Sequence, residues 1–194
     1  TGANITGTSD KLAITKILDF ALEMKPEIKT LGYLYNTGED NSVSTLKEVK
    51  AYCEEKGITV IEGAASNTSE VQEAAQNLAA KCDAVFSPND NTIAGAMGTV
   101  TEVMNKAKVP MFVGADSMVI DGGLGTVGIE YSDLGKETAN MAAQILSGEK
   151  KASEIPIKVF NEDLSTYINK TTADTIGITI PDDIANGEKT VYFD

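Results

Sequence analysis

Apolar residues recur along this chain at two spacings, one typical of helices and the other of buried strands. Between Lys11 and Met24 they lie three or four positions apart, which predicts an amphipathic helix capped by Asp10. Thr30–Tyr35 is a short and mostly apolar run that predicts a buried strand. Further helices are predicted after Ser42 and Ser132, which are placed to cap them. These and the other expected elements are helices over 43–56, 71–81, 91–106 and 133–146, and strands over 58–61, 83–86, 110–113 and 125–129.

Strands that alternate with crossover helices fold into a parallel sheet with helices on both faces. The sequence therefore predicts an α/β fold with a doubly wound, flavodoxin-like sheet in which the strand order is 2-1-3-4-5. Beyond residue 150 the pattern is less regular, with extended stretches near 155–160 and 166–168 and a short helix from about Thr171. A length of 194 residues suits one large domain, or a domain with part of another.

Polar residues follow the predicted strands where such a sheet binds its ligands. In a doubly wound sheet the site lies beyond the carboxyl ends of the strands, where the strand order reverses. The first strand ends at Tyr35-Asn36, the third at Ser87–Asn91 and the fourth at Gly114–Ser117. These residue types also favour turns and helix caps, so Asp90 or Asn91 could serve only to cap the following helix. Asp116 has the strongest functional claim, because no helix is evident after it to be capped.

Composition narrows the classes of function. The net charge of −13 disfavours nucleic acid and anionic membrane surfaces as partners. There is no His, Trp or Arg, so His-based catalysis, His metal sites and bidentate Arg clamps are excluded. No phosphate-binding glycine motif is found, and no cofactor is expected. The glycines at Asp121–Gly125 precede a strand and predict a turn, and the pairs Glu39-Asp40 and Asp182-Asp183 predict solvated turns rather than a metal site.

Other features describe the chain's setting. Cys53 and Cys82 are too few for a disulfide framework and are expected to be small buried residues. No apolar run is long enough to span a membrane. The chain begins with Thr1 and its first ten residues have the composition of an interior loop, so a preceding segment is expected.

Five stretches, in order and spanning nearly the whole chain, carry a family resemblance. They are NITGTSD (4–10), LGYLYNTGEDNS (31–42), DAVFSPNDNTI (83–93), PMFVGADSMVIDGGLGTVGIEYSDLG (110–135) and YINKTTADTIGITIP (167–181). With them the sequence resembles the ABC transporter substrate-binding family that includes tryptophan- and tyrosine-uptake binding lipoproteins. The resemblance implies a two-lobed, type I periplasmic-binding-protein fold that closes on its ligand, an extracytoplasmic location and an ABC permease as partner.

The resemblance also implies a division of the chain. Residues 1–10 would be a hinge segment and 11–127 the second ligand-binding lobe. Residues 128–163 would cross to a first lobe that precedes residue 1, and 164–194 would return to the second lobe. The helix near 133–146 would then lack its sheet, leaving Leu134, Met141, Ala142 and Ile145 without a buried partner. We expect it to pack on its own lobe, to pack on a second copy in a swapped homodimer, or to be disordered.

The family resemblance also implies which residues of this chain contact the ligand, where its motifs match. The resemblance places ligand contacts on the loops that hold Thr8, Ser9, Asn36, Ser42, Asp90, Asn91 and Asp116. This set suits a zwitterionic amino acid, because hydroxyl groups at Thr8, Ser9 and Ser42 can receive a carboxylate while Asp90 or Asp116 pairs with an ammonium. An aromatic side chain of the ligand could rest on Tyr35, Phe86 or Tyr131, although each could equally be packing.

Three functions follow from these observations. The leading hypothesis is the solute-binding component of an importer for an amino acid, aromatic or otherwise apolar. The alternative is the ligand-sensing domain of a transcriptional regulator, which shares this architecture. An enzyme that uses Asp90 and Asp116 as acid and base is disfavoured, because the usual acid–base and phosphate-binding groups are missing.

Overall fold

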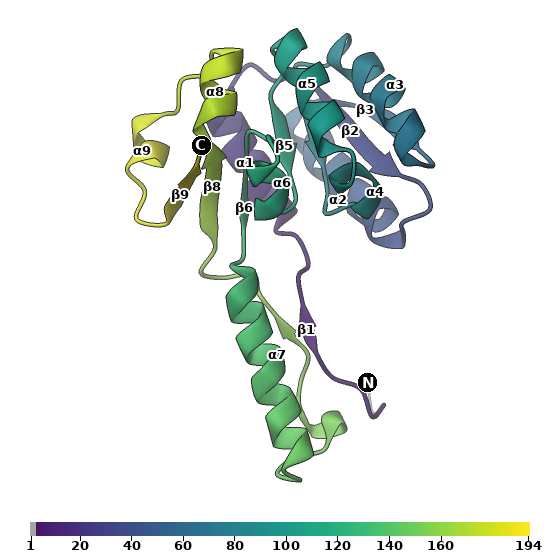
Figure 1. The fold of residues 1–194 in the computed structure, drawn as a ribbon, viewed down its shortest axis with the longest axis vertical. Helices are drawn as coiled ribbons and strands as arrows, with labels where there is room; N and C mark the ends of the chain where they lie inside the picture. Colours follow the sequence, from purple (N-terminus) through teal and green to yellow (C-terminus); the bar gives the residue numbers. More distant parts are fainter. Residues whose placement is uncertain (1–2) are drawn as a thin grey trace. The chain divides into compact units, whose positions relative to one another are not determined.

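The computed structural model describes residues 3–194, and within this range a seven-stranded sheet has the order β3-β2-β4-β5-β6-β8-β9 (Figure 1). Parallel pairing joins β2 to β3 and β4, β4 to β5, β5 to β6, and β8 to β9. The strands are β2 (Thr30–Asn36), β3 (Thr59–Ala65), β4 (Ala84–Ser87), β5 (Met111–Val113), β6 (Gly125–Gly128), β8 (Ser165–Asn169) and β9 (Thr190–Phe193). From β2 to β6 the order is 2-1-3-4-5, which confirms the predicted flavodoxin-like sheet, and β8 and β9 extend it.

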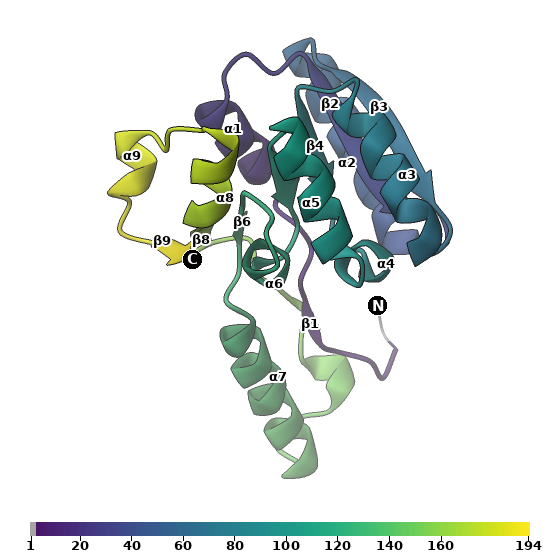
Figure 2. The same cartoon turned by 45° about the horizontal axis from the view of Figure 1, so that its top comes forward.

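Helices cover both faces of this sheet (Figure 2). They are α1 (Ile14–Met24), α2 (Asp40–Lys56), α3 (Thr68–Ala79), α4 (Asn91–Ala94), α5 (Met97–Ala107), α6 (Asp116–Ile120), α8 (Lys170–Ile176) and α9 (Asp182–Ala185). Successive residues of β2 show the two faces. The Tyr33 hydroxyl donates to the Ser42 carbonyl of α2, whereas the neighbouring Leu34 packs in the cluster beneath α3 and α5.

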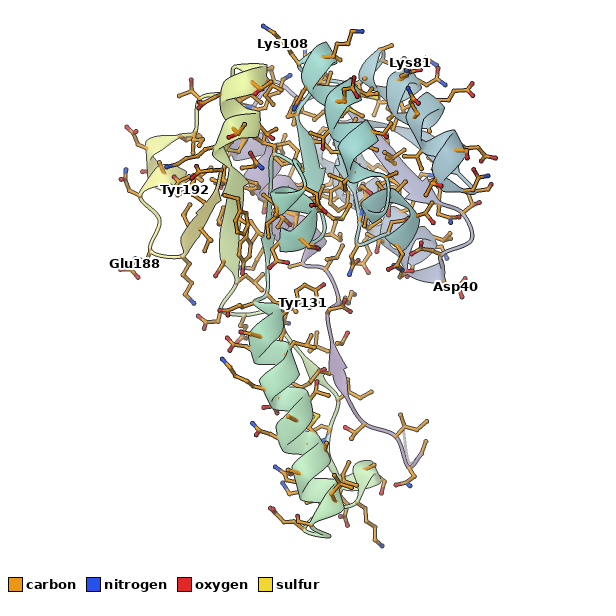
Figure 3. All side chains as sticks on the ribbon, viewed as in Figure 1. Asp40, Lys81, Lys108, Tyr131, Glu188 and Tyr192 are labelled. Carbon is orange, nitrogen blue, oxygen red and sulfur yellow. The ribbon has the colours of Figure 1, made fainter. Side chains whose placement is uncertain are left out.

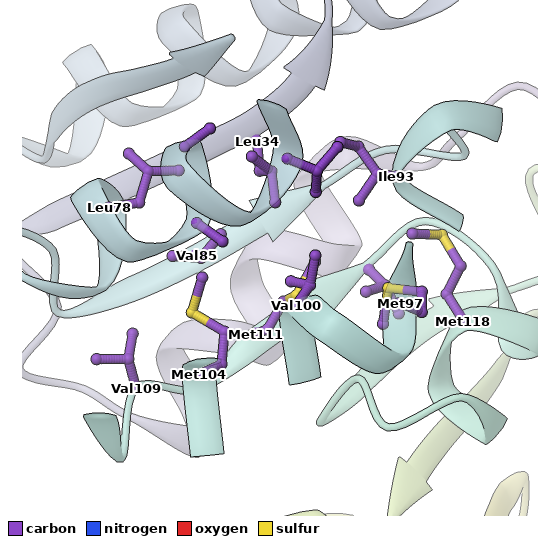
Figure 4. Packing of buried hydrophobic residues seen from close by; sticks show 14 of the residues in the cluster. Leu34, Leu78, Val85, Ile93, Met97, Val100, Met104, Val109, Met111 and Met118 are labelled. Atoms are coloured by element: carbon purple, nitrogen blue, oxygen red, sulfur yellow. The ribbon is translucent and has the colours of Figure 1, made fainter. Parts of the chain in front are cut away.

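The core is apolar on both faces. Beneath α3 and α5, Leu34, Val85 and Met111 of the strands contact the inward side chains of the helices (Figure 4). On the opposite face Phe20 of α1 meets Phe112 edge-on, with ring centroids 5.7 Å apart. Cys53 and Cys82 are free and buried, as predicted. This packing fixes the strands, and therefore the positions at which they end.

Three predicted helix caps are wrong. α1 begins at Ile14 rather than after Asp10, and Ala13 at its cap position makes no side-chain bond. α2 begins at Asp40, two residues before Ser42, and the Ser42 hydroxyl donates to Asp90 on another loop instead of capping the helix. The helix expected after Ser132 begins at Tyr131, and Glu130 at its cap position makes no capping hydrogen bond within the described residues.

The structure corrects the predicted helix over 91–106 and confirms the predicted turn before β6. The helix expected over 91–106 is broken into α4 and α5 around Gly95-Ala96. The glycine-rich segment before β6 is a turn, as predicted. Gly122 there has a φ of 109°, and a Cβ at this position would lie 2.4 Å from the Thr101 side chain.

The chain divides into two compact units. The larger unit comprises Ala13–Gly128 and Thr166–Asp194, and the smaller comprises the residues up to Leu12 together with Ile129–Ser165. In the smaller unit β1 (Thr8–Ser9) pairs in parallel with β7 (Lys158–Val159), and α7 (Tyr131–Leu146) contacts β1. A short 3₁₀ helix, η1 (Ala152–Glu154), precedes β7.

The helix expected to lack its sheet is formed in the smaller unit, so the predicted outcome of disorder is wrong. The Thr138 hydroxyl of α7 lies 2.7 Å from that of Thr8. Met141 is buried, whereas Leu146 is 87% exposed. Most of the helix surface therefore lies open within this unit. Among residues 3–194 no helix combines the length and apolar character needed to cross a membrane.

Candidate functional site

The carboxyl ends of β2, β4 and β5 lie side by side in the larger unit, because the three strands are parallel neighbours. After β2 the chain enters α2 on one face of the sheet, and after β4 it enters α4 and α5 on the other. The two loops therefore diverge at the topological switch point, where doubly wound sheets bind ligands. The rim is formed by residues 36–42, 87–92 and 114–117, and Asp40 at its edge is exposed (Figure 3).

Asp90 lies at the centre of this rim and is fully buried. Its Oδ2 accepts hydrogen bonds from the Asn36 amide and the Ser42 hydroxyl, both at 2.7 Å. Its Oδ1 accepts from the amides of Thr92 and Ile93, each at 3.1 Å, and so caps α4. Each oxygen has two donors, so the prediction that Asp90 could cap α4 is confirmed, and its carboxylate is already satisfied by the protein.

Glu39 makes the complementary connection. From the loop after β2 its Oε2 accepts from the amide and the side-chain Nδ2 of Asn91, both at 3.0 Å. Its Oε1 accepts from the Thr92 amide at 3.1 Å. Burial by itself would raise the pKa of Glu39, but the hydrogen bonds from Asn91 and Thr92 hold it below its ordinary value. The prediction that Glu39 lies in a solvated turn is therefore wrong.

The side chain of Asn36 also joins the two loops. Its Nδ2 donates to the Thr92 hydroxyl at 2.7 Å, and its Oδ1 accepts from the Gly38 amide at 2.7 Å. Asn41 Nδ2 donates to the Asn89 carbonyl at 3.0 Å. The predicted contacts Asn36, Ser42, Asp90 and Asn91 are thus brought together, and much of their hydrogen-bonding capacity is used within the rim.

Asp116 differs from these residues. It is the first residue of α6 and half-buried, and its Oδ1 accepts from the Ser117 amide at 2.8 Å. Within residues 3–194 its Oδ2 has no hydrogen-bond partner. A helix does follow this residue, contrary to the expectation from sequence. That helix has only five residues, which is too short for its apolar spacing to be recognised.

The aromatic candidates lie elsewhere. Tyr35 is buried on the α2 face of the sheet, 5.1 Å from Tyr33 between ring centroids, and donates to Glu62 Oε2 at 2.8 Å. Burial and this hydrogen bond raise the pKa of Tyr35 to about 12. Phe86 is fully buried in the core. Tyr131 belongs to the smaller unit, where its hydroxyl donates to Asp10 at 3.3 Å.

Thr8 and Ser9 form β1 of the smaller unit, in register with Lys158 and Val159 of β7. The Ser9 hydroxyl accepts from the Lys11 amide at 3.3 Å. Both residues are half-buried within the structure, and their role as ligand contacts stays a prediction.

The rim is acidic and contains no basic side chain. Residues 36–42, 87–92 and 114–117 include Glu39, Asp40, Asp90 and Asp116, but no lysine. Glu39 and Asp90 are held by neutral N–H and O–H donors, so their negative charge is not cancelled by an ion pair among the described residues. A rim of this kind favours a cationic group of a ligand and repels a carboxylate.

Comparison with known proteins shows which family this chain resembles. The chain matches the sequence profile described as "ABC transporter substrate binding protein" over residues 1–191. It is 34% identical over 161 residues to the tyrosine-binding protein of Clostridioides difficile. This alignment covers 83% of this chain and 46% of that protein. The chain spans about half the length of the curated relatives it matches.

Two solved structures share the fold. A Streptococcus pneumoniae ABC domain in complex with L-Trp is 36% identical, with a TM-score of 0.89, over 100% of this chain and 66% of that one. A conserved domain protein from Vibrio cholerae is 33% identical, with a TM-score of 0.89, over 97% of this chain and 62% of that one. The match over nearly the whole sequence, on a type I periplasmic-binding-protein fold, establishes the family. This chain belongs to the ABC transporter substrate-binding protein family.

Proposed function

We propose that this chain forms part of the solute-binding component of an ABC importer and that its ligand is an amino acid with an aromatic or other apolar side chain. The solved relative in complex with L-Trp and the tyrosine-binding relative support this ligand class. The protein would act outside the cytoplasm and deliver its ligand to a membrane permease. The family match favours this role over a ligand-sensing domain of a transcriptional regulator.

The observation that supports the ligand chemistry is Asp116 Oδ2, which has no hydrogen-bond partner in the described part of the chain. In this proposal the ligand's ammonium group binds Asp116 Oδ2, because the oxygens of Asp90 already accept four hydrogen bonds. Uncancelled charge on the neighbouring carboxylates adds to the attraction. The rim has no lysine and would repel the ligand's carboxylate, so this group would be received by neutral donors outside the rim.

We further propose that residues 128–163, nearly all of which lie in the smaller unit, are a crossover segment of a two-lobed protein, and that residues 1–10 are a hinge segment. In that arrangement residues 128–163 belong to the first lobe, as expected from the resemblance, and the larger unit is the second lobe. The exposed apolar residues Leu146 and Ile157 support this assignment, because a packed lobe would cover them.

Isothermal titration with L-tryptophan and L-tyrosine tests the function. D116N should weaken binding about 10- to 100-fold, as expected for loss of a charged hydrogen bond. D121N is the matched control, because Asp121 lies at the other end of α6 and is exposed. Indole-3-propionate lacks the ammonium group and should bind weakly to the unaltered protein and to D116N alike. Equal affinity of D116N and the unaltered protein for tryptophan would refute the role of Asp116, and binding of sugars alone would refute the amino-acid class.

A further inference from the structure

The loops after β2 and β4 exchange carboxylates. Glu39 from the β2–α2 loop binds the start of α4, and Asp90 from the β4–α4 loop binds the Asn36 amide and the Ser42 hydroxyl on the β2 side. Each loop therefore supplies the acceptor that satisfies the donors of the other. We call Glu39 and Asp90, with the donors that they bind, the carboxylate clasp.

The clasp spans a large sequence separation. The hydrogen bonds of the clasp that join the two loops connect residues 48 to 54 positions apart, so local turn formation cannot account for them, whereas the bonds from Thr92 and Ile93 to Asp90 are local. Together the two carboxylates occupy the amides of Asn91, Thr92 and Ile93 at the start of α4. These donors are therefore not available to a ligand carboxylate.

We propose that Glu39 and Asp90 are positioning residues, which fix the two loops of the switch point in the geometry that ligand binding requires and do not themselves contact the ligand. This inference rests on the proposed function and deepens it. A rim whose loops are already ordered binds without the entropic cost of ordering them. Within the clasp, Asp90 is fully buried, whereas Glu39 is half-buried and lies nearer the surface.

The two carboxylates suit different experiments. Removing the buried Asp90 leaves three donors unsatisfied, because the Thr92 amide keeps its bond to Glu39, and can unfold the protein. Glu39 is half-buried, and its donors can reach water. E39A is therefore the informative variant. Glu70 gives a matched control, because it accepts from the Ser66 amide at 2.8 Å and from Asn67 Nδ2 at 2.9 Å and, among residues 3–194, its side chain has no hydrogen bond to the loops after β2 and β4.

Two measurements on the full chain test the clasp. Amide hydrogen exchange without ligand should be faster at residues 91–93 and 36–42 in E39A than in the unaltered protein, and unchanged there in E70A. Titration with L-tryptophan and L-tyrosine should show about 5- to 10-fold weaker binding by E39A, through a less favourable entropy, and no change in E70A. E39D keeps a carboxylate and should restore part of the affinity. The melting temperatures of E39A and E70A should fall by similar small amounts.

The outcomes separate this inference from the proposed function. Faster exchange in E39A with unchanged affinity would overturn the positioning role, as would equal losses of affinity in E39A and E70A. If the unaltered protein binds neither amino acid, the proposed ligand class fails. The exchange measurement still decides the clasp in that case, because unchanged protection in E39A would show that Glu39 does not fix the loops.

Discussion

Replacing Asp90 by alanine should destabilise the larger unit by about 3 kcal/mol. The carboxylate is fully buried and accepts four hydrogen bonds. Loss of the cap on α4 costs about 1–2 kcal/mol. Each donor left unpaired in the interior, here the Asn36 amide and the Ser42 hydroxyl, costs about 1–3 kcal/mol. Release of a buried charge offsets part of the total, which leaves the estimate of about 3 kcal/mol.

Urea denaturation followed by circular dichroism measures this loss, and a thermal scan should show a melting temperature lower by about 6–12 °C. D121A is the control, because Asp121 is exposed and its side chain takes no part in the rim. Its stability should stay within about 0.5 kcal/mol of the unaltered protein.

A double-mutant cycle with S42A tests the assigned contact. S42A alone should cost about 1–2 kcal/mol, because Asp90 loses a charged hydrogen bond, but close to nothing when Asp90 is already alanine. The reasoning is refuted if D90A costs less than about 1 kcal/mol or if the two substitutions are simply additive.

Other predictions concern pH, packing and thiol chemistry. The pKa of Glu39 is lower in the folded protein than its ordinary value, so the carboxylate stabilises the fold above the ordinary carboxyl pKa, and this stabilisation is lost as pH falls from about 5 towards 3. In urea titrations the stability difference between the unaltered protein and E39A should therefore shrink over that range. A difference that stays constant would contradict this prediction. G63A should cost about 1–3 kcal/mol, because a Cβ there would lie 2.5 Å from Leu78 Cδ1. G98A, in the open part of helix α5, should instead add about 0.5–1 kcal/mol in the same denaturation assay. Burial raises the pKa of the Cys53 thiol to about 11, so it should react with a thiol reagent at pH 8 only after unfolding, and rapid reaction of the folded protein would show that the site is open.

Strand order could be predicted because it follows from local patterns. Apolar runs such as Thr30–Tyr35 mark buried strands, and helices between them leave a parallel sheet as the consistent arrangement. Helix starts were predicted less well. Ser42 has the residue type of a cap, but its hydroxyl binds Asp90, 48 positions away, and a propensity for capping contains no information on such a partner.

The candidate site was located but not resolved by sequence. Asn36, Asp90 and Asp116 were expected on one rim because parallel strands end at one edge, and the structure brings their segments together there. Glu39 was missed, because a carboxylate beside Asp40 after a turn has the pattern of a solvated loop. Its partners Asn91 and Thr92 come close to Glu39 only when β2 and β4 pair in the folded sheet.

By itself, the sequence determined the α/β class, the strand order from β2 to β6 and a rim with carboxylates and no lysine, because these depend on residue type and spacing. Only the tertiary structure decided how the carboxylates of Asp90 and Asp116 differ. They are the same residue type at equivalent strand ends, yet Asp90 is buried among four donors, whereas Asp116 keeps one oxygen with no partner among residues 3–194. The difference arises from the donors that distant loops bring to Asp90, which depend on the packing of the sheet rather than on any local pattern.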